Sequence, residues 1–268
     1  MKILVLGAGK QGGAAAFDLL RNPEVEQVGI ADLDSEALET LHTRLADRRV
    51  FLHHVELDDP HLTSELISPY DACLNALSPW YSLDITRAAI EARTHLCDLG
   101  GGSEVVSQLL KLDTSAFEAG ITVIPDCGLA PGLVTILAAH GIRRLDEAVS
   151  VHIRVGDLPR TTTSPLRYQL SYPVERLLNK YAERAILIRD GVRLSVEPLT
   201  EVEDIEFPEP FGTLEAFNTA GGLSTLASTF AGKVRNLDYK SIRYPGHCAM
   251  LKPLRELGFF AREPLTIG

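Results

Sequence analysis

The chain opens with Met1-Lys2 and the apolar run Ile3-Leu4-Val5-Leu6, which passes directly into Gly7-Ala8-Gly9-Lys10-Gln11-Gly12. The run predicts a buried strand, and the segment after it matches G-x-G-x-x-G where a strand would turn into a helix. In such a turn Gly7 permits the tight reversal, Gly9 lets the backbone approach a pyrophosphate, and Gly12 lets the helix pack closely on the strand. We expect the helix that begins near Lys10 and Gln11 to hold the phosphates at its N-terminus. The motif therefore predicts a dinucleotide-binding domain.

The first 140 residues alternate between short β-branched runs and amphipathic stretches. This alternation is typical of βαβ units around a parallel sheet, and six strands suit a doubly wound Rossmann fold. The expected strands are Lys2–Leu6, Gln27–Ala31, Val50–His54, Ala72–Asn75, His95–Asp98 and Thr122–Pro125. The expected helices are Gln11–Arg21, Ser35–Ala46, Leu62–Ile67, Leu83–Ala92 and Glu104–Ala119.

The pattern changes after Pro131-Gly132 and a helix expected near Leu133–Ile142. Longer strands follow, among them Val149–Val155, Ala185–Ile188 and Asp238–Tyr244, with proline-rich turns between them. This pattern predicts an α+β domain on a mostly antiparallel sheet. We place the boundary near residue 131, giving a nucleotide-binding domain over 1–131 and a substrate-binding or oligomerisation domain over 132–268. The terminal run, residues 264–268, has the pattern of a beginning strand.

Composition narrows the class of protein. A formal net charge of −10 argues against a nucleic-acid partner, which would need clustered Lys and Arg. The apolar stretches are too short for a membrane span, and no histidine spacing suggests a metal site. The four cysteines, Cys73, Cys97, Cys127 and Cys248, form no C-x-x-C pair, so we expect buried thiols in a reducing cytoplasm and no disulfide.

Asp32 ends the second expected strand, twenty residues after Gly12. A carboxylate at this position accepts hydrogen bonds from the ribose hydroxyls and repels a 2′-phosphate. Leu33-Asp34-Ser35 follows, without the arginine that often accompanies NADP. We expect Asp34 to cap the next helix, and Asp32 to favour NAD over NADP.

Further motifs give the chain a resemblance to the saccharopine dehydrogenase family. They are Asn75-Ala76-Leu77, residues 98–101 (DLGG) and residues 126–132 (DCGLAPG) in the first half, and residues 211–217, 221–226 and 239–247 in the second. The second-half motifs are similar to the lysine 6-dehydrogenase branch. The resemblance runs from residue 1 to about residue 250, and relatives extend beyond position 268. Saccharopine-forming members tend to carry an acidic residue where this chain has Ala130.

That branch implies oxidation of the side-chain amine of L-lysine with NAD, giving a semialdehyde that cyclises and releasing ammonia. The family also implies a small amino acid or polyamine-like substrate and a homodimer or homotetramer. A second reading keeps the fold but condenses an amine with an aldehyde and reduces the imine, as saccharopine- and carboxynorspermidine-forming relatives do. A third is a non-catalytic dinucleotide sensor.

Ligands of a doubly wound sheet bind at the carboxyl ends of its strands. We expect Asn75, Ala76, Leu77, Gly128 and Pro131 to contact the cofactor there. Trp80 and Tyr81 would form an apolar wall beside the nicotinamide, or pack ordinarily. Asp98 would stabilise the substrate ammonium or accept its proton, or it would simply cap the next helix. Asp126 would bind the substrate, or it would only shape a turn.

The second domain supplies the other candidates. Arg243 has the planar fork that clamps a carboxylate, and Lys240 or His247 is a candidate general base. Strand alternation places Lys240 on the face opposite Arg243, so these residues share one pocket only if the strand bends at Pro245-Gly246. Ser224 and Thr225 begin a helix that would bind a carboxylate or simply be capped. Arg167, Tyr168 and Tyr172 would line a pocket or an interface.

Overall fold

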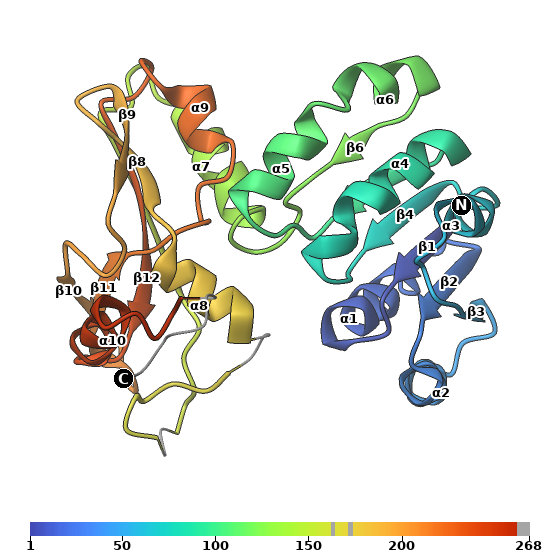
Figure 1. Cartoon of the computed structure of the whole chain (residues 1–268), viewed down its shortest axis with the longest axis horizontal. Coiled ribbons are helices and arrows are strands. Elements are labelled where there is room, and N and C mark those ends of the chain that lie inside the picture. The colour runs from blue at the N-terminus through green and yellow to red at the C-terminus, as the bar shows by residue number, and fades with distance from the viewer. Residues whose placement is uncertain (162–163, 171–173, 262–268) are drawn as a thin grey trace, which may run out of the picture. The chain divides into compact units, whose positions relative to one another are not determined.

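The computed structural model describes residues 1–161, 164–170 and 174–261, without the side chains at positions 103, 175 and 176. Its internal contacts divide the chain into two compact units, Met1–Gly128 and Leu129–Gly268 (Figure 1). The boundary that the sequence suggests, near residue 131, lies close to this division. Tyr172 and the expected strand at 264–268 lie outside the described residues.

The first unit is a six-stranded sheet in the order β3-β2-β1-β4-β5-β6, and every neighbouring pair is parallel. The predicted doubly wound fold is therefore confirmed. The strands are β1 (Lys2–Leu6), β2 (Gln27–Asp32), β3 (Val50–His54), β4 (Ala72–Asn75), β5 (His95–Asp98) and β6 (Val123–Ile124). The helices are α1 (Lys10–Leu19), α2 (Ser35–Leu45), α3 (Pro60–Ile67), α4 (Ser82–Ala92), α5 (Ser103–Leu110) and α6 (Asp113–Ala119), with the 3₁₀ turn η1 at Pro79–Tyr81.

One expected helix is wrong in extent. The stretch Glu104–Ala119 forms two helices, α5 and α6, rather than one. The break lies at Lys111 and Leu112, whose amides bond to the carbonyls three residues back, at Gln108 and Leu109. Such bonds tighten the last helical turn and end it.

The alternation of β1 explains why helices cover both faces of this sheet. Ile3 and Val5 pack with residues of α1 and α2, whereas Leu4 and Leu6 pack with residues of α3 and α4. Successive side chains of a strand point to opposite faces, so a fully apolar central strand needs a cover on each side. Figure 1 shows these two layers of helices on either side of the blue-to-green sheet.

The second unit contains a mixed sheet in the order β10-β11-β12-β8-β9, with β7 paired to β12. Among the described strands, the β7–β12 pairing is parallel and the others are antiparallel, so the mostly antiparallel sheet is confirmed. Its strands are β7 (Ser150–Gly156), β8 (Ala185–Arg189), β9 (Val192–Val196), β10 (Glu203–Phe207), β11 (Gly212–Asn218) and β12 (Asn236–Arg243). Its helices are α7 (Leu133–Arg143), α8 (Val174–Ala182), α9 (Leu226–Phe230) and α10 (His247–Glu256).

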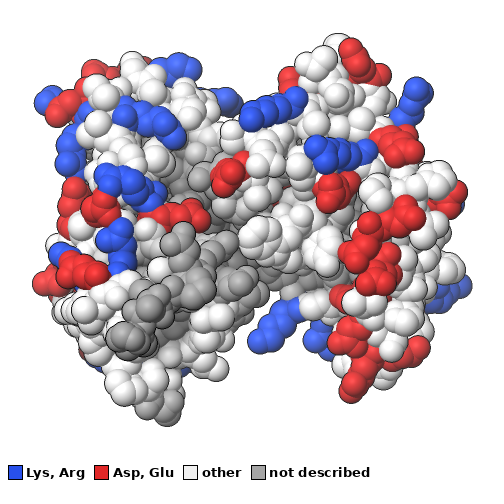
Figure 2. All heavy atoms as spheres, viewed as in Figure 1, with Lys and Arg blue, Asp and Glu red and all other residues white. Residues whose placement is uncertain are grey.

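Charge is mixed over the visible surface. On the face drawn in Figure 2, basic and acidic side chains are interspersed and form no continuous basic track among the described residues. None of the helices in the described part of the chain is both long and apolar enough to cross a membrane.

Candidate active site

The glycine turn between β1 and α1 has the geometry that a pyrophosphate needs. Gly7 has φ of 109°, a left-handed value that favours glycine. A Cβ on Gly12 would lie 1.9 Å from the carbonyl oxygen of Gly7, so no side chain fits between helix and turn. A Cβ on Gly9 would meet nothing within 4 Å, which leaves open space at the start of α1. The turn thus fits a phosphate group approaching the helix N-terminus, where Lys10 and Gln11 are exposed.

Asp32 ends β2 beside this turn. Its carboxylate accepts hydrogen bonds from the amide of Ala8 at 2.6 Å and from the amide of Asp34 at 3.0 Å. The side chain of Asp34 accepts from the amides of Glu36 and Ala37, both at 3.0 Å. The predicted helix cap at Asp34 is therefore confirmed, and Asp32 remains at the strand end next to the phosphate turn.

The loops that follow β4, β5 and β6 interlock at the carboxyl ends of these strands. A Cβ on Gly100 would lie 2.1 Å from Oδ1 of Asp126, and one on Gly101 would lie 2.0 Å from the ring of Pro79. Gly100 also has φ of 84°, and Asp126 has φ of 58°. Two consecutive glycines therefore let three loops pack against each other. We call this region, together with the Gly7–Gly12 turn and Asp32, the carboxyl edge.

Asn75 and Asp98 form the buried centre of the carboxyl edge. The Asn75 amide donates to Oδ2 of Asp98 at 2.6 Å, and the amide of Gly100 donates to Oδ1 at 2.6 Å. The Asn75 side-chain oxygen accepts from the amide of Leu77 at 3.1 Å. Asp98 is 1% exposed, and both of its oxygens hold the loops in place. The hydrogen bonds of Asp98 therefore position Asn75 and Gly100 at the carboxyl edge.

The structure gives the following positions for three other predicted cofactor residues. The amide of Ala76 donates to the carbonyl of Leu6 at 2.8 Å, which ties the end of β4 to the end of β1. Gly128 is the last residue of the first unit and is half-buried. Pro131 follows a cis bond from Ala130 and belongs to the second unit.

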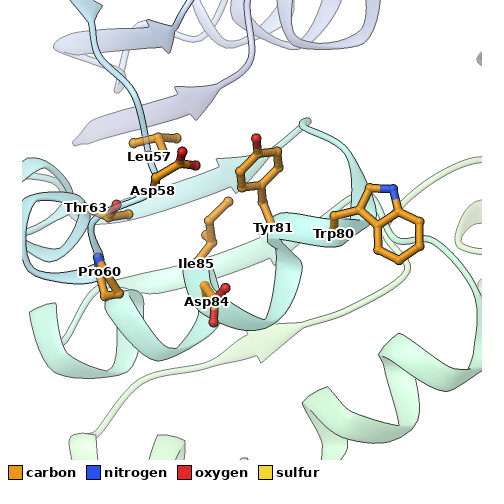
Figure 3. Close-up of a pocket in the computed structure, with 8 residues that line it drawn as sticks. All are labelled: Leu57, Asp58, Pro60, Thr63, Trp80, Tyr81, Asp84 and Ile85. Carbon is orange, nitrogen blue, oxygen red and sulfur yellow. The ribbon is translucent and has the colours of Figure 1, made fainter.

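A pocket of about 210 Å³ opens beside the carboxyl edge, between the segment after β3 and the segment after β4 (Figure 3). Leu57 and Asp58 line one side, and Tyr81 with Ile85 lines the other. Tyr81 points toward Leu57 and Asp58, whereas the indole of Trp80 extends away from that group. The sequence signals Trp80 and Tyr81 but gives no sign of Leu57 and Asp58, because that segment carries no motif.

The second unit holds a buried polar and aromatic network between β12, α8 and α10. Nε of Arg243 donates to the hydroxyl of Tyr181 at 3.0 Å, and that hydroxyl lies 3.0 Å from Nε2 of His247. Nδ1 of His247 lies 3.0 Å from the carbonyl of Leu166. The guanidinium of Arg243 also stacks on the ring of Tyr168, 4.7 Å from its centre. We call these five residues the Arg243 cluster.

The hydrogen bonds of the Arg243 cluster fix its protons. A carbonyl only accepts, so Nδ1 of His247 carries the proton given to Leu166. Nε2 then accepts the proton of the Tyr181 hydroxyl, and the oxygen of that hydroxyl accepts from Arg243. Burial lowers the pKa of His247 to about 4; the bond to Leu166 opposes this shift and the charge of Arg243 adds to it. His247 is therefore neutral near pH 7, with its basic nitrogen turned to Tyr181.

Glu215 on β11 anchors the helix that carries His247. Its two carboxylate oxygens accept from the amide of Gly246 at 2.9 Å and from the amide of Cys248 at 2.6 Å. A carboxylate at a helix N-terminus satisfies free amides and interacts favourably with the helix dipole. Neither Glu215 nor Tyr181 stands out in the sequence as a site residue, since each acts on residues far away in the chain.

Lys240 lies away from the Arg243 cluster. Its Nζ donates to the carbonyl of Glu201 at 2.7 Å and to the carboxylate of Glu203 at 2.9 Å, and Glu203 also pairs with Arg154. The strand alternation expected for β12 is thus present, with Lys240 and Arg243 on opposite faces. Arg243 and His247 are brought together through Tyr181, and Lys240 is not.

The remaining candidates occupy separate positions. Thr225 precedes α9, is exposed, and makes no side-chain cap bond to the helix. Ser224 has a left-handed φ of 48° and is half-buried. The described residues contain no group of three or more His, Cys, Asp or Glu side chains able to hold a metal ion.

Comparison with known proteins gives the family. Residues 3–124 match the saccharopine dehydrogenase NADP binding domain, and residues 128–267 match the saccharopine dehydrogenase C-terminal domain. The chain is 26% identical to alpha-aminoadipic semialdehyde synthase, mitochondrial, of Bos taurus, over 98% of this chain and 29% of that protein. It is 22% identical to carboxynorspermidine synthase of Vibrio cholerae, over all of this chain and 69% of that protein.

A solved structure has the same fold. Saccharopine dehydrogenase (L-Glu forming) from Saccharomyces cerevisiae superposes with a TM-score of 0.77 at 19% identity, over 97% of this chain and 58% of that one. The match to the bovine protein, described above, spans under a third of that protein's length. Because the two family models together cover nearly the whole chain, this protein belongs to the saccharopine dehydrogenase family.

Proposed function

We propose that the chain binds NAD in preference to NADP. The observation that carries this proposal is the position of Asp32, at the end of β2 and hydrogen-bonded to the phosphate turn through Ala8. A second carboxylate, Asp34, follows it, and Glu36 lies in the first turn of the next helix. This negative surface favours two ribose hydroxyls and disfavours a 2′-phosphate. The family model that matches this unit is described as NADP binding, so the preference needs a direct test.

Asp32→Asn tests the preference. We expect its affinity for NAD to fall about tenfold or more, because hydrogen bonds to a charged acceptor contribute roughly 1.5–3 kcal/mol each. We expect its affinity for NADP to hold or rise as the repulsion is removed. Asp34→Asn is the matched control, since asparagine keeps the helix cap while removing a nearby charge. Equal affinities of the unaltered protein for NAD and NADP, measured by calorimetry, would refute the proposal.

We further propose that the enzyme oxidises the side-chain amine of an amino acid, with L-lysine the first candidate. The second-half motifs of the lysine 6-dehydrogenase branch support this choice. The cofactor would accept the hydride, and the amine-bearing carbon would become an imine that water hydrolyses to an aldehyde and ammonia. Within this proposal the substrate remains a small amine-bearing amino acid and the enzyme a homo-oligomer in the cytoplasm.

The geometry suggests how the residues share the work. Tyr81 and Asp58 line a pocket that suits the adenine end of a dinucleotide, with an aromatic ring for stacking and a carboxylate for its exocyclic amine. Asp98 and Asn75 hold the carboxyl edge in shape, and Asp126 packs within it. Arg243 is the candidate anchor for the substrate carboxylate, supported by its hydrogen bond to Tyr181. His247 supplies a neutral imidazole, and a proton would pass to or from its Nε2 through the hydroxyl of Tyr181.

The experiment is to mix the protein with NAD and L-lysine at alkaline pH and follow NADH absorbance. Ornithine, saccharopine and NADP run in parallel. NADH formation with lysine and not with the others is the expected result. NAD binding without turnover on any amine would reject the oxidative proposal.

The imine-reducing direction is the second candidate. The similarity to carboxynorspermidine synthase over the whole chain favours it. Consumption of NADH in the presence of a diamine and an amino acid semialdehyde, with no reaction of lysine and NAD, would select it. A protein that binds dinucleotide and shows neither reaction would instead be a sensor.

A further inference from the structure

Two cysteines far apart in the sequence meet at the carboxyl edge. Cys97 lies in β5 and is paired in register with Ile124 of β6. The thiol of Cys127 turns back to the carbonyl of that same Ile124, at 3.3 Å, and the amide of Cys127 donates to the carbonyl of Asp98 at 2.8 Å. These two contacts place the Cys127 side chain beside Cys97, and the two thiols are within hydrogen-bonding reach of each other.

The spacing fits a disulfide. Neighbouring strands lie about 4.8 Å apart, so Ile124 is beside Cys97, and the contact of the Cys127 thiol with the Ile124 carbonyl brings that thiol to the same place; the Cα atoms of bridged cysteines are usually about 4.4–6.8 Å apart. The parallel register of β5 and β6, together with the turn-back at Cys127, supplies this proximity without any C-x-x-C motif. Both thiols are free and partly exposed. Cys73 and Cys248, in contrast, are free but buried.

We propose that Cys97 and Cys127 form a redox-active dithiol that hydroperoxides convert into an intramolecular disulfide. With hydrogen peroxide, the thiolate of Cys97 attacks one peroxide oxygen, the O–O bond breaks and a sulfenic acid forms, while the departing hydroxide takes up a proton and leaves as water. The thiol of Cys127 then attacks the sulfenic sulfur, the S–S bond forms, the S–O bond breaks, and a second water leaves with the thiol proton. Two electrons pass from the two sulfurs to the peroxide, and a dithiol reductant reverses the change.

The environments of the two thiols assign their roles. The interaction with the neighbouring Cys127 thiol lowers the pKa of Cys97 to about 7, against the opposing effect of burial. The same interaction raises the pKa of Cys127, and burial adds to the rise. Because the thiolate is the nucleophile, Cys97 reacts first and Cys127 resolves the sulfenic acid. This inference is independent of the nucleotide and of the substrate proposed above.

The test uses the full chain and hydrogen peroxide. After brief treatment with an equimolar amount, the protein is unfolded, its free thiols are alkylated, and its peptides are mapped by mass spectrometry. We expect the mass to fall by two hydrogen atoms, and the linked peptides to join Cys97 to Cys127. Dithiothreitol should restore alkylation of all four cysteines. Oxidation that leaves these two thiols free, links chains to each other, or involves Cys73 would overturn the proposal.

Variants separate the two roles. Cys127→Ser should stop at a sulfenic acid on Cys97, trapped by a dimedone reagent, whereas Cys97→Ser should lower the rate of peroxide reaction at least about tenfold. Cys73→Ser and Cys248→Ser are matched controls that should leave the bridge unchanged. Equal peroxide reactivity in Cys97→Ser and the unaltered protein would also overturn the assignment, and this comparison needs no catalytic assay.

Discussion

The Gly7–Gly12 turn of the first unit and the Arg243 cluster of the second are both candidate binding regions, but their parts come from different distances along the chain. Gly7, Gly9 and Gly12 lie within six positions, and a missing side chain is what each contributes. The Arg243 cluster joins Leu166, Tyr181 and His247, residues separated by up to 81 positions. The turn depends on backbone shape, and the Arg243 cluster depends on buried side chains.

This difference between backbone shape and buried side chains determines which substitutions should destabilise each region. At Gly12 the turn has no room for an added atom, because the obstacle is the fixed carbonyl of Gly7. A buried side-chain network tolerates small shape changes but not an unsatisfied donor or acceptor. Substitutions chosen for each region therefore test whether these two kinds of construction are correctly assigned.

Gly12→Ala should have the largest effect. Its methyl would lie 1.9 Å from the Gly7 carbonyl oxygen, so the helix or the turn must move. We expect a loss of about 3 kcal/mol or more in the stability of the first unit, above the usual cost of overpacking because the obstacle is backbone. Urea unfolding followed by fluorescence measures this directly, since Trp80 is the single tryptophan and lies in this unit.

Gly9→Ala is the matched control for that prediction. Its methyl meets nothing within 4 Å, and its φ of −69° suits any residue. We expect a stability change within about 0.5 kcal/mol, yet weaker dinucleotide binding, because the methyl occupies the approach to the helix N-terminus. Equal unfolding midpoints for the two variants would contradict the assignment of Gly12 to helix packing.

The pH dependence of the Arg243 cluster should come next. The pKa of His247 is about 4 in the folded chain and near 6.5 in an unfolded one. The unfolded chain therefore binds more protons between about pH 6.5 and pH 4, and the stability present above this range is lost as the pH falls through it. The shift corresponds to a contribution on the order of 3 kcal/mol.

His247→Gln isolates this contribution. The variant should be less stable than the unaltered protein at pH 7, and the gap should close as the pH approaches about 4. Hydrogen exchange of peptides from β12 and α10, corrected for the intrinsic rate at each pH, reports on this unit. Parallel pH profiles for the two proteins would show that the histidine titrates normally and is not held neutral.

Sequence reasoning reached further in the first unit than in the second. Each strand of the parallel sheet, the glycine turn and the Asp34 cap depend on residues within a few positions of each other, so local patterns suffice to predict them. The α5–α6 break was not predicted, because no glycine or proline marks it. The pocket residues Leu57 and Asp58 were missed since their role depends on where the segment after β4 folds back.

In the second unit the pattern predicted the sheet and the opposite faces of Lys240 and Arg243, but not their partners. Tyr181 lies on a helix with no motif, and only the packing of α8 on β12 brings its hydroxyl between Arg243 and His247. The proximity of Cys97 and Cys127 likewise depends on strand register, which places Cys97 beside Ile124, the residue whose carbonyl the Cys127 thiol contacts. Contacts of this kind depend on tertiary structure, which a single sequence does not display.

The two carboxylates that cap helices, Asp34 and Glu215, should give the smallest losses of stability, and they compare a local cap directly with a long-range one. Asp34 caps α2 from the adjacent position, whereas Glu215 caps α10 from a different strand and is 6% exposed. Glu215→Gln keeps one acceptor but removes the charge and turns an amide toward a backbone N–H, so we expect a loss of roughly 2 kcal/mol. Asp34→Ala should cost only about 1 kcal/mol, the usual value for an exposed cap.

Both variants are compared by urea unfolding, with hydrogen exchange of α2 and α10 locating each loss. The Glu215 change should loosen α10 and with it the Arg243 cluster, because His247 is the first residue of that helix. The Asp34 change should loosen α2 alone, since the bonds that its side chain accepts come from Glu36 and Ala37 in the first turn of that helix. A larger loss of stability in Asp34→Ala than in Glu215→Gln would show that Glu215 stabilises the second unit less than its burial implies. The contrast between local and long-range contacts would then be wrong.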